Sequence, residues 1–268
     1  MFANRGRLDT FVGNPENRCR IRCLVAAGGD GTVSDLVNRH PDLPVAVLPM
    51  GTENLLARHL KMPRDGRVVA AAIQQANVRR FDTIQVGNRQ FLLMASAGID
   101  AEVVHRLHAS RSGHIHHWTY VRPILQTFAS YRFPEFSVTD MDTGTTTQGT
   151  HVIVSNFREY GFNLKFTPDA DPTDGQLDVR VFQGRSLGST IVHAVVSLFR
   201  AQYGRKVIRF RSRHVSLTAS FKEQTVSDSL GIPLEADGDE AGHLPVDIQV
   251  NPSAMRLIVH GDYPTPER

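Results

Sequence analysis

Gly28-Gly29-Asp30-Gly31-Thr32 lies between an apolar run and a helical run, and this placement decides the fold. Ile21–Ala27 before it is typical of a short buried strand, and Thr32–Arg39 after it has apolar residues at helical spacing. Glycines have no Cβ atom, so their N–H groups can approach an anion, which the start of a helix also favours. The stretch predicts a phosphate-binding turn. A tight turn with Thr32 as a helix cap is the alternative.

The same order of elements follows once more along the chain. Pro44–Leu48 is a second strand-like run, Pro49-Met50-Gly51-Thr52 is its turn, and Glu53–Leu60 has helical spacing. A further helix is predicted over Arg67–Ala76. Strand, turn and helix in alternation indicate a parallel sheet covered by helices. Ligands of such sheets lie at the carboxyl ends of the strands, so we expect the two turns to form one crevice.

From Phe81 onward the sequence is dominated by short strand-like runs separated by Gly, Asp, Pro and Ser. Helices are predicted only over Trp118–Tyr131 and Leu187–Tyr203. The predicted strands are Phe81–Val86, Gln90–Ala95, Glu135–Thr139, His151–Ser155, Leu177–Phe182, Val207–Phe210, His214–Thr218, Asp247–Val250 and Arg256–Val259. We therefore expect two domains, a parallel α/β nucleotide-binding domain over residues 1–85 and a β-sandwich domain over residues 86–268.

Composition sets limits on the class of protein. The formal charge of +3 is too small to require a nucleic-acid partner. The two cysteines, Cys19 and Cys23, have no second pair, which argues against a zinc site or a disulfide framework and makes a reducing cytosol the default. No apolar run is long enough for a transmembrane helix, so action on a membrane would be peripheral. The polar residues before Ile21 are expected to be loosely ordered.

The run from Val25 to Pro63, which holds both turns, strongly resembles the diacylglycerol kinase catalytic-domain family. That family includes bacterial lipid kinases and sphingosine kinases. Further segments carry the resemblance in the same order along the chain. They are Ala97-Gly98-Ile99-Asp100-Ala101, Thr167–Val179, Asp237-Gly238-Asp239 and Ile248–Pro252. Together these motifs cover nearly the whole chain.

The resemblance implies an enzyme with a nucleotide-binding α/β domain and a β-sandwich domain. It implies that ATP is held by Gly28, Gly29, Asp30, Gly31, Thr32, Val33, Ser34, Thr52 and Asn54. Asp239 would accept the proton of the substrate hydroxyl, and Asp237 would support it or bind Mg²⁺. A magnesium site would use the side chain of Asp174 and the backbone carbonyls of Asp171 and Gln176. Asp100 is a further candidate.

Several alternatives stay open at this level. The base is either Asp239 or Glu240, and Asp-Gly pairs are also a strong signal for a hairpin turn. The expected activity is transfer of the γ-phosphate of ATP to a hydroxyl of diacylglycerol, a sphingoid base or phosphatidylglycerol. A kinase of the NAD kinase type and an inactive lipid- or nucleotide-binding relative are the rival interpretations. The protein is expected in the cytoplasm, peripherally at a membrane, without nucleic acid and with a homodimer as a possible assembly.

Overall fold

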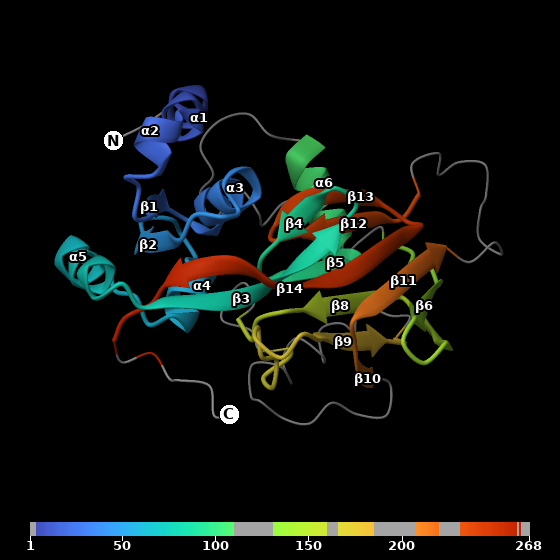
Figure 1. Cartoon of the computed structure of the whole chain (residues 1–268). Helices are drawn as coiled ribbons and strands as arrows, with labels where there is room; N and C mark the ends of the chain where they lie inside the picture. Colours follow the sequence, from blue (N-terminus) through green and yellow to red (C-terminus); the bar gives the residue numbers. More distant parts are fainter. Residues whose placement is uncertain are drawn as a thin grey trace. The chain divides into compact units, whose positions relative to one another are not determined.

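The computed structural model describes residues 4–109, 131–159, 166–184, 207–219, 231–261 and 263. The chain forms two compact units, one made of residues 1–79 with 255–268 and the other of residues 80–254. The predicted helix over 187–203 lies outside the described residues, as does the helix over 118–131 apart from Tyr131. Figure 1 shows the elements in sequence colours.

The first unit is built on parallel strands, as the sequence predicts. β1 (Leu24–Gly28) pairs in parallel with β2 (Val45–Pro49). The end of β14 (Val246–Ile258) adds a parallel neighbour on the other side of β2, with Leu257 opposite Val45. After β1, this unit contains the helices α3 (Asp30–Arg39), α4 (Leu55–His59) and α5 (Gly66–Gln75).

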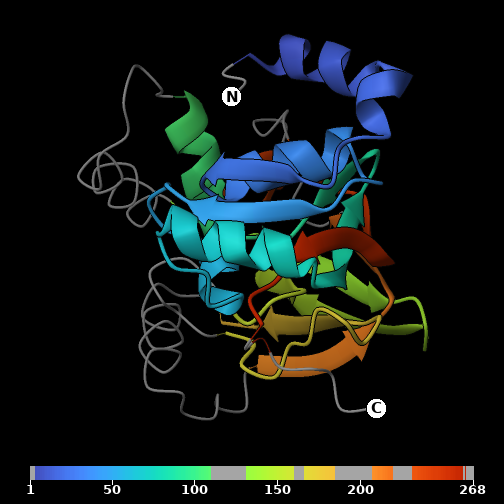
Figure 2. The same cartoon turned by 60° about the vertical axis from the view of Figure 1, so that its left-hand side comes forward.

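Burial in these strands follows from the helices that cover them. α3 packs on β1 and β2 through its buried apolar residues, and α5 packs on β2 (Figure 2). All residues of β2 are therefore buried or half-buried, whereas β1 alternates and leaves Val25 47% exposed. The α/β interpretation of the first part of the chain is confirmed.

Two helices lie within residues 4–20, so the expectation of a loosely ordered start was wrong for these residues. α1 spans Arg5–Gly13 and α2 spans Pro15–Arg18. The side chain of Asn4 caps α1 by accepting the N–H of Arg7. Asp9 on α1 forms ion pairs with Arg39 and His40, at and just after the end of α3. These tertiary contacts hold a polar segment whose own sequence has no amphipathic signal.

The second unit is a pair of antiparallel sheets. One contains β3 (Val78–Val86), β4 (Arg89–Phe91), β6 (Phe136–Asp140), β7 (Thr145–Gly149), β11 (His214–Ala219) and the first part of β14. The other has the order β10-β9-β8-β5-β12-β13. Its strands are β5 (Met94–Ala97), β8 (His151–Ser155), β9 (Leu177–Phe182), β10 (Val207–Ser212), β12 (Pro233–Ala236) and β13 (Asp239–His243). α6 (Ile99–Ala109) contacts β5, β12 and β13.

The core of this unit lies between its sheets, because buried residues from both belong to one cluster. Phe136, Leu217 and Ile248 come from one sheet, and Val154 and Leu177 come from the other. This arrangement confirms the predicted β-sandwich.

Some details differ from the sequence expectations. Asp247–Val250 and Arg256–Val259 were predicted as two strands, but one continuous strand, β14, runs from Val246 to Ile258. Residues 255–268 consequently group with the first unit, whereas a single boundary after residue 85 was expected. A single boundary along the sequence cannot separate the two units, because one strand, β14, pairs with β11 at one end and with β2 at the other.

Candidate functional site

The two glycine turns of the first unit lie in direct contact. A Cβ atom on Gly51 would lie 2.5 Å from the Cα of Gly29, and one on Gly29 would lie 3.3 Å from the Cα of Gly51. A Cβ on Gly28 would overlap the side chain of Thr32, whereas Gly31 has open space at the same position. Packing within the turns therefore explains three of the glycines, and only Gly31 leaves room for a group from outside.

Asp30 joins the two turns. Its carboxylate accepts the backbone N–H groups of Leu55 and Leu56 at 2.9 Å each, and so caps the start of α4. Asn54 has a left-handed backbone with φ of 50°, and its side chain bonds both the N–H and the carbonyl of Gly51. Asp30 and Asn54 thus serve first to shape the turns around Gly51.

The remaining predicted nucleotide residues differ in what they offer to a ligand. Gly29 begins α3 without a side-chain cap, and Thr32 and Thr52 are exposed. Ser34 is half-buried. The side chain of Val33 is fully buried in the core, so Val33 can contribute only its backbone. An uncapped helix start with exposed hydroxyls beside it suits a phosphate group.

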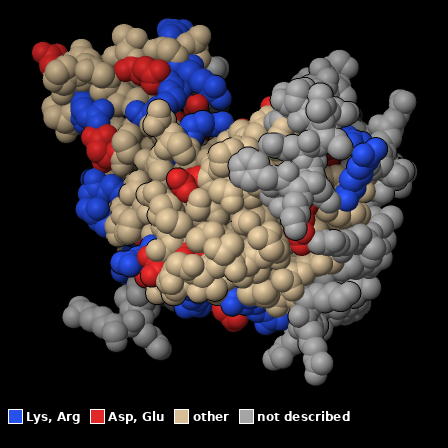
Figure 3. All heavy atoms as spheres, turned by 90° about the vertical axis from the view of Figure 1, so that its right-hand side faces the viewer, with Lys and Arg blue, Asp and Glu red and all other residues tan. Residues whose placement is uncertain are grey.

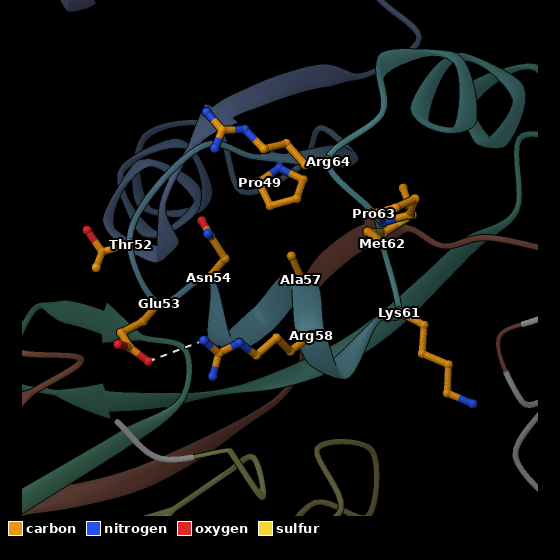
Figure 4. A pocket seen from close by; sticks show the side chains of 10 residues that line it. All are labelled: Pro49, Thr52, Glu53, Asn54, Ala57, Arg58, Lys61, Met62, Pro63 and Arg64. Carbon is orange, nitrogen blue, oxygen red and sulfur yellow. Dashed lines mark ion pairs between the residues drawn. The ribbon is translucent and has the colours of Figure 1, made fainter. Parts of the chain in front are cut away.

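A hollow of ≈ 310 Å³ adjoins the second turn within the first unit (Figure 4). Thr52 and Asn54 line it together with Pro49, Met62 and Pro63. Its cationic residues are Arg58, Lys61 and Arg64. Arg58 pairs with Glu53 at 3.5 Å, so the rim keeps a surplus of positive charge that favours an anion.

In the second unit, Asp237-Gly238 forms the turn between β12 and β13, with positive φ at both residues. The Asp237 carboxylate accepts the N–H groups of Leu92, Leu93 and Met94 at 2.6–3.1 Å. Its oxygens are therefore committed to backbone donors, which fits the role of a support better than that of a metal ligand. The hairpin and the functional interpretations of Asp-Gly-Asp are compatible.

Asp239 and Glu240, the two candidate bases, are exposed at the start of β13. Asp239 lies opposite Ala236, and Glu240 lies opposite Glu235. Glu240 is engaged with α6, because its Oε1 lies 2.9 Å from Nδ1 of His105. The contact ties Glu240 to α6, and both carboxylates remain candidates for the base.

The loop over residues 171–176 is rich in oxygen ligands. Oδ1 of Asp171 accepts from Thr173, and Oδ1 of Asp174 accepts from the N–H of Gln176. Asp82, which the sequence interpretation missed, is buried beside this loop and accepts the N–H of Gly175 at 2.8 Å. Burial raises the pKa of Asp82, and the charges of Asp174 and Asp171 raise it further. Its only sequence signal was a carboxylate within an apolar run.

No group of three or more His, Cys, Asp or Glu side chains that could hold a metal occurs in the described ranges. Mg²⁺, however, commonly takes only one or two carboxylates and keeps several waters. The carboxylate of Asp174 and the backbone carbonyls of this loop are oxygen donors of the kind that Mg²⁺ takes. The residues present therefore fit a magnesium ion.

A second set of polar groups that the sequence interpretation missed is buried around Ser96. The Ser96 hydroxyl lies 2.7 Å from Oε1 of Glu235 and 2.7 Å from Oδ2 of Asp100. Nε2 of His151 lies 3.2 Å from the same oxygen of Asp100, without the alignment of a hydrogen bond. The sequence motif around Asp100 indicated this region as a candidate. The sequence could not show that the strand carrying Glu235 lies beside it.

On the face drawn in Figure 3, uncharged residues fill the middle and charges of both signs are interspersed along the edges of the described part. Arg211, in β10, lies near Asp174 and Asp178, and Arg213, just after β10, pairs with Asp142. None of the described helices is both long and apolar enough to cross a membrane.

The comparisons with known proteins agree with this architecture. Residues 7–86 match the model of the diacylglycerol kinase catalytic domain, and residues 93–259 match that of the YegS C-terminal NAD kinase beta sandwich-like domain. A parallel α/β unit followed by this sandwich defines a class of kinases. Within that class, the chain belongs to the diacylglycerol kinase catalytic-domain family.

Individual proteins with names of this kind are similar to the chain. The chain is 28% identical to a diacylglycerol kinase of Mycobacterium tuberculosis over 88% of its length and 76% of that protein. Its fold is similar to that of a diacylglycerol kinase from Bacillus anthracis str. Sterne, with a TM-score of 0.68 and 16% identity. That comparison covers 98% of this chain and 85% of the other.

Proposed function

We propose that this protein is an ATP-dependent lipid kinase that transfers the γ-phosphate of ATP to a hydroxyl of diacylglycerol or a similar lipid. The observation that carries the proposal is the pair of glycine turns locked together by Asp30, with space left only at Gly31. Such a turn at an uncapped helix start is suited to phosphate oxygens. Membership of the diacylglycerol kinase family supports the same substrates.

In this proposal the first unit binds the nucleotide. The backbone from Gly28 to Ser34 holds phosphate oxygens, and the exposed Thr52 hydroxyl donates to one of them. Asp30 and Asn54 act by fixing the two turns, since their side chains are already engaged there. Phosphoryl transfer depends mainly on positioning and charge neutralisation, so a rigid turn contributes directly to the rate.

In the second unit, Asp239 acts as the base. As the lipid hydroxyl oxygen bonds to the γ-phosphorus, the bond from phosphorus to the bridging oxygen breaks and ADP leaves. The hydroxyl proton passes to the Asp239 carboxylate. Asp237 holds the turn through its three backbone donors. Glu240, whose Oε1 lies 2.9 Å from Nδ1 of His105, is the other candidate.

Mg²⁺ is proposed at the loop of Asp171, Asp174 and Gln176. When bound, it would neutralise charge on this carboxylate-rich loop. Asp82 would gain most from such a cation, because its carboxylate is buried near two other acids. Since its acceptor resides in a membrane, the enzyme is proposed to work in the cytoplasm with peripheral contact to the lipid surface and to serve phospholipid metabolism.

The test is transfer of labelled phosphate from ATP in the presence of Mg²⁺. Vesicles containing diacylglycerol, a sphingoid base or phosphatidylglycerol are compared with soluble NAD, and products are separated by chromatography. We expect a labelled lipid, a loss of at least about 100-fold in kcat for Asp239→Asn, and a loss below about tenfold for Glu240→Gln. Labelled NAD would support the NAD kinase alternative, and nucleotide binding without transfer would support an inactive relative.

A further inference from the structure

Ser96 and Glu235 lie directly opposite each other on the antiparallel strands β5 and β12. Both residues are buried, with 0% and 3% of their surface exposed. The Ser96 hydroxyl oxygen lies 2.7 Å from Oε1 of Glu235 and 2.7 Å from Oδ2 of Asp100. Both distances are those of O–H···O hydrogen bonds. One hydroxyl therefore connects two carboxyl groups.

The number of hydrogens decides the charge of this group. A serine hydroxyl has one hydrogen to donate, and an ionised carboxylate can only accept. Two hydrogen bonds along the chain of oxygens from Asp100 through Ser96 to Glu235 need two hydrogens. The second hydrogen must reside on one of the carboxyl groups, which then donates to the Ser96 oxygen.

The surroundings place this proton on Glu235. The Asp100 side chain is 21% exposed and accepts the N–H of Ala101, both of which favour its ionised form. The nearest charged groups acting on Glu235 are the acids Asp100 and Asp237. Burial, followed by repulsion from Asp100, raises the pKa of Glu235 to about 8.

The other oxygen of Glu235 reaches the turn that carries the proposed base. Oε2 accepts the N–H of Gly238 at 3.0 Å, directly between Asp237 and Asp239. Gly238 has a positive φ of 84°, and an exposed Asp239 follows it. The hydrogen bond between Ser96 and Oε1 and the one from Gly238 to Oε2 thus fix both oxygens of one carboxyl group.

We propose that Glu235 is a positioning residue that works as a neutral carboxylic acid, donating to Ser96 and holding the Gly238 turn so that Asp239 is presented to the substrate. This inference rests on the proposed function for the role of Asp239, but the protonation of Glu235 follows from the buried group and its neighbours and does not depend on that role. Glu235 does not touch the reacting atoms in this proposal.

Ionisation of Glu235 would leave two carboxylates facing one hydroxyl. Because its folded pKa is raised above the unfolded value, its contribution to stability is fully present below about pH 4.5. That contribution is lost as the pH rises through about 8. Other titratable groups around it are Glu102 on α6, the buried Tyr131 near Asp100 and Glu102, and His151 on β8. Histidines titrate in the same pH range, so His151 needs a control of its own.

The test compares Glu235→Gln with Glu235→Ala. Glutamine keeps both bonds, since its amide N–H can donate to Ser96 and its oxygen can accept from Gly238. Isotope-edited infrared spectroscopy should show a protonated carboxyl group at pH 6 that is absent from Glu235→Gln. Between about pH 5 and 8 the folding equilibrium constant of the wild type should fall by up to tenfold per pH unit relative to Glu235→Gln. His151→Gln should keep this slope.

Kinase activity supplies the positioning readout. The kcat of the wild type should decline above pH 8. Glu235→Gln should keep kcat within about threefold at pH 7 and should lose this decline. Glu235→Ala should lose at least about tenfold in kcat with little change in the KM for ATP. If Glu235→Ala does not fold, Ser96→Ala replaces it, with the amide shift of Gly238 as a second readout.

A wild type without a protonated carboxyl signal would overturn the inference. So would a loss in Glu235→Gln as large as that in Glu235→Ala. If the wild type phosphorylates no lipid, the proposed function fails instead, and the infrared and unfolding data still decide the state of Glu235.

Discussion

Gly51 illustrates how a single residue sets the geometry of the candidate nucleotide site. The two turns approach so closely that a Cβ on Gly51 would overlap the backbone of Gly29, and a Cβ on Gly29 would make a tight contact with Gly51. Asp30 and Asn54 then fasten the turns by hydrogen bonds to backbone groups. The Gly-Gly-Asp-Gly pattern is therefore largely a packing requirement between two turns. Gly31 is the glycine of this pattern that packing does not require.

This difference between glycines predicts different effects of the same substitution. Gly51→Ala should lower the free energy of unfolding by about 1–3 kcal/mol, because its methyl group would overlap the backbone of Gly29. Gly31→Ala, the matched control, has open space and should change stability by less than about 0.5 kcal/mol. Urea unfolding measures both. Equal stability losses would contradict the packing explanation. Weaker ATP binding by a stable Gly31→Ala would support approach of phosphate there.

Among the elements, α1 depends most on contacts from another helix. Arg5 pairs with Asp35, and Arg39 and His40 pair with Asp9. The apolar contribution of α1 is mainly Val12, which is completely buried. Pairs of exposed groups contribute little to global stability, but they can decide whether a terminal helix stays docked.

Asp9→Ala should therefore loosen α1 while leaving the rest of the first unit intact. Hydrogen exchange measured peptide by peptide should become faster over residues 5–13 and stay unchanged over α5. Glu16→Ala on α2 is the control, since it removes an equal charge from a residue with no ion pair among those described. Unchanged protection of α1 in Asp9→Ala would show that Val12 alone holds the helix.

At the scale of the whole molecule, the proposed magnesium site should couple ligand binding to folding. An ion that binds only the folded protein stabilises it by RT ln(1 + [L]/Kd), about 2.7 kcal/mol at a hundredfold excess over Kd. Mg²⁺ should raise the melting temperature of the wild type, and Asp174→Asn should lose most of that increase. Asp247→Asn, at an exposed carboxylate of the same unit, should keep it. Chelation by EDTA should reverse the effect. An equal response of Asp174→Asn would contradict the assignment.

The sequence predicted those parts of the fold that depend on local pattern. Strands β8 and β9 begin and end where their apolar runs do, because both are buried cross-strand partners in a core sheet. α1 was missed because its docking depends on charges at the end of α3. Glu235 was missed for a related reason, since a lone glutamate beside an Asp-Gly turn looks exposed until its partner strand is known.

The path of β14 has a consequence for how the protein is made. Its last residues, Leu257 and Ile258, complete the parallel sheet that begins with β1 and β2, although the ribosome synthesises them more than two hundred residues after Val45. The first unit is thus begun first and finished last. Until the end of β14 emerges, one edge of β2 has no strand beside it, and such an edge can pair wrongly with other chains. We expect nascent chains stalled before Met255 to need chaperones more than the completed protein does.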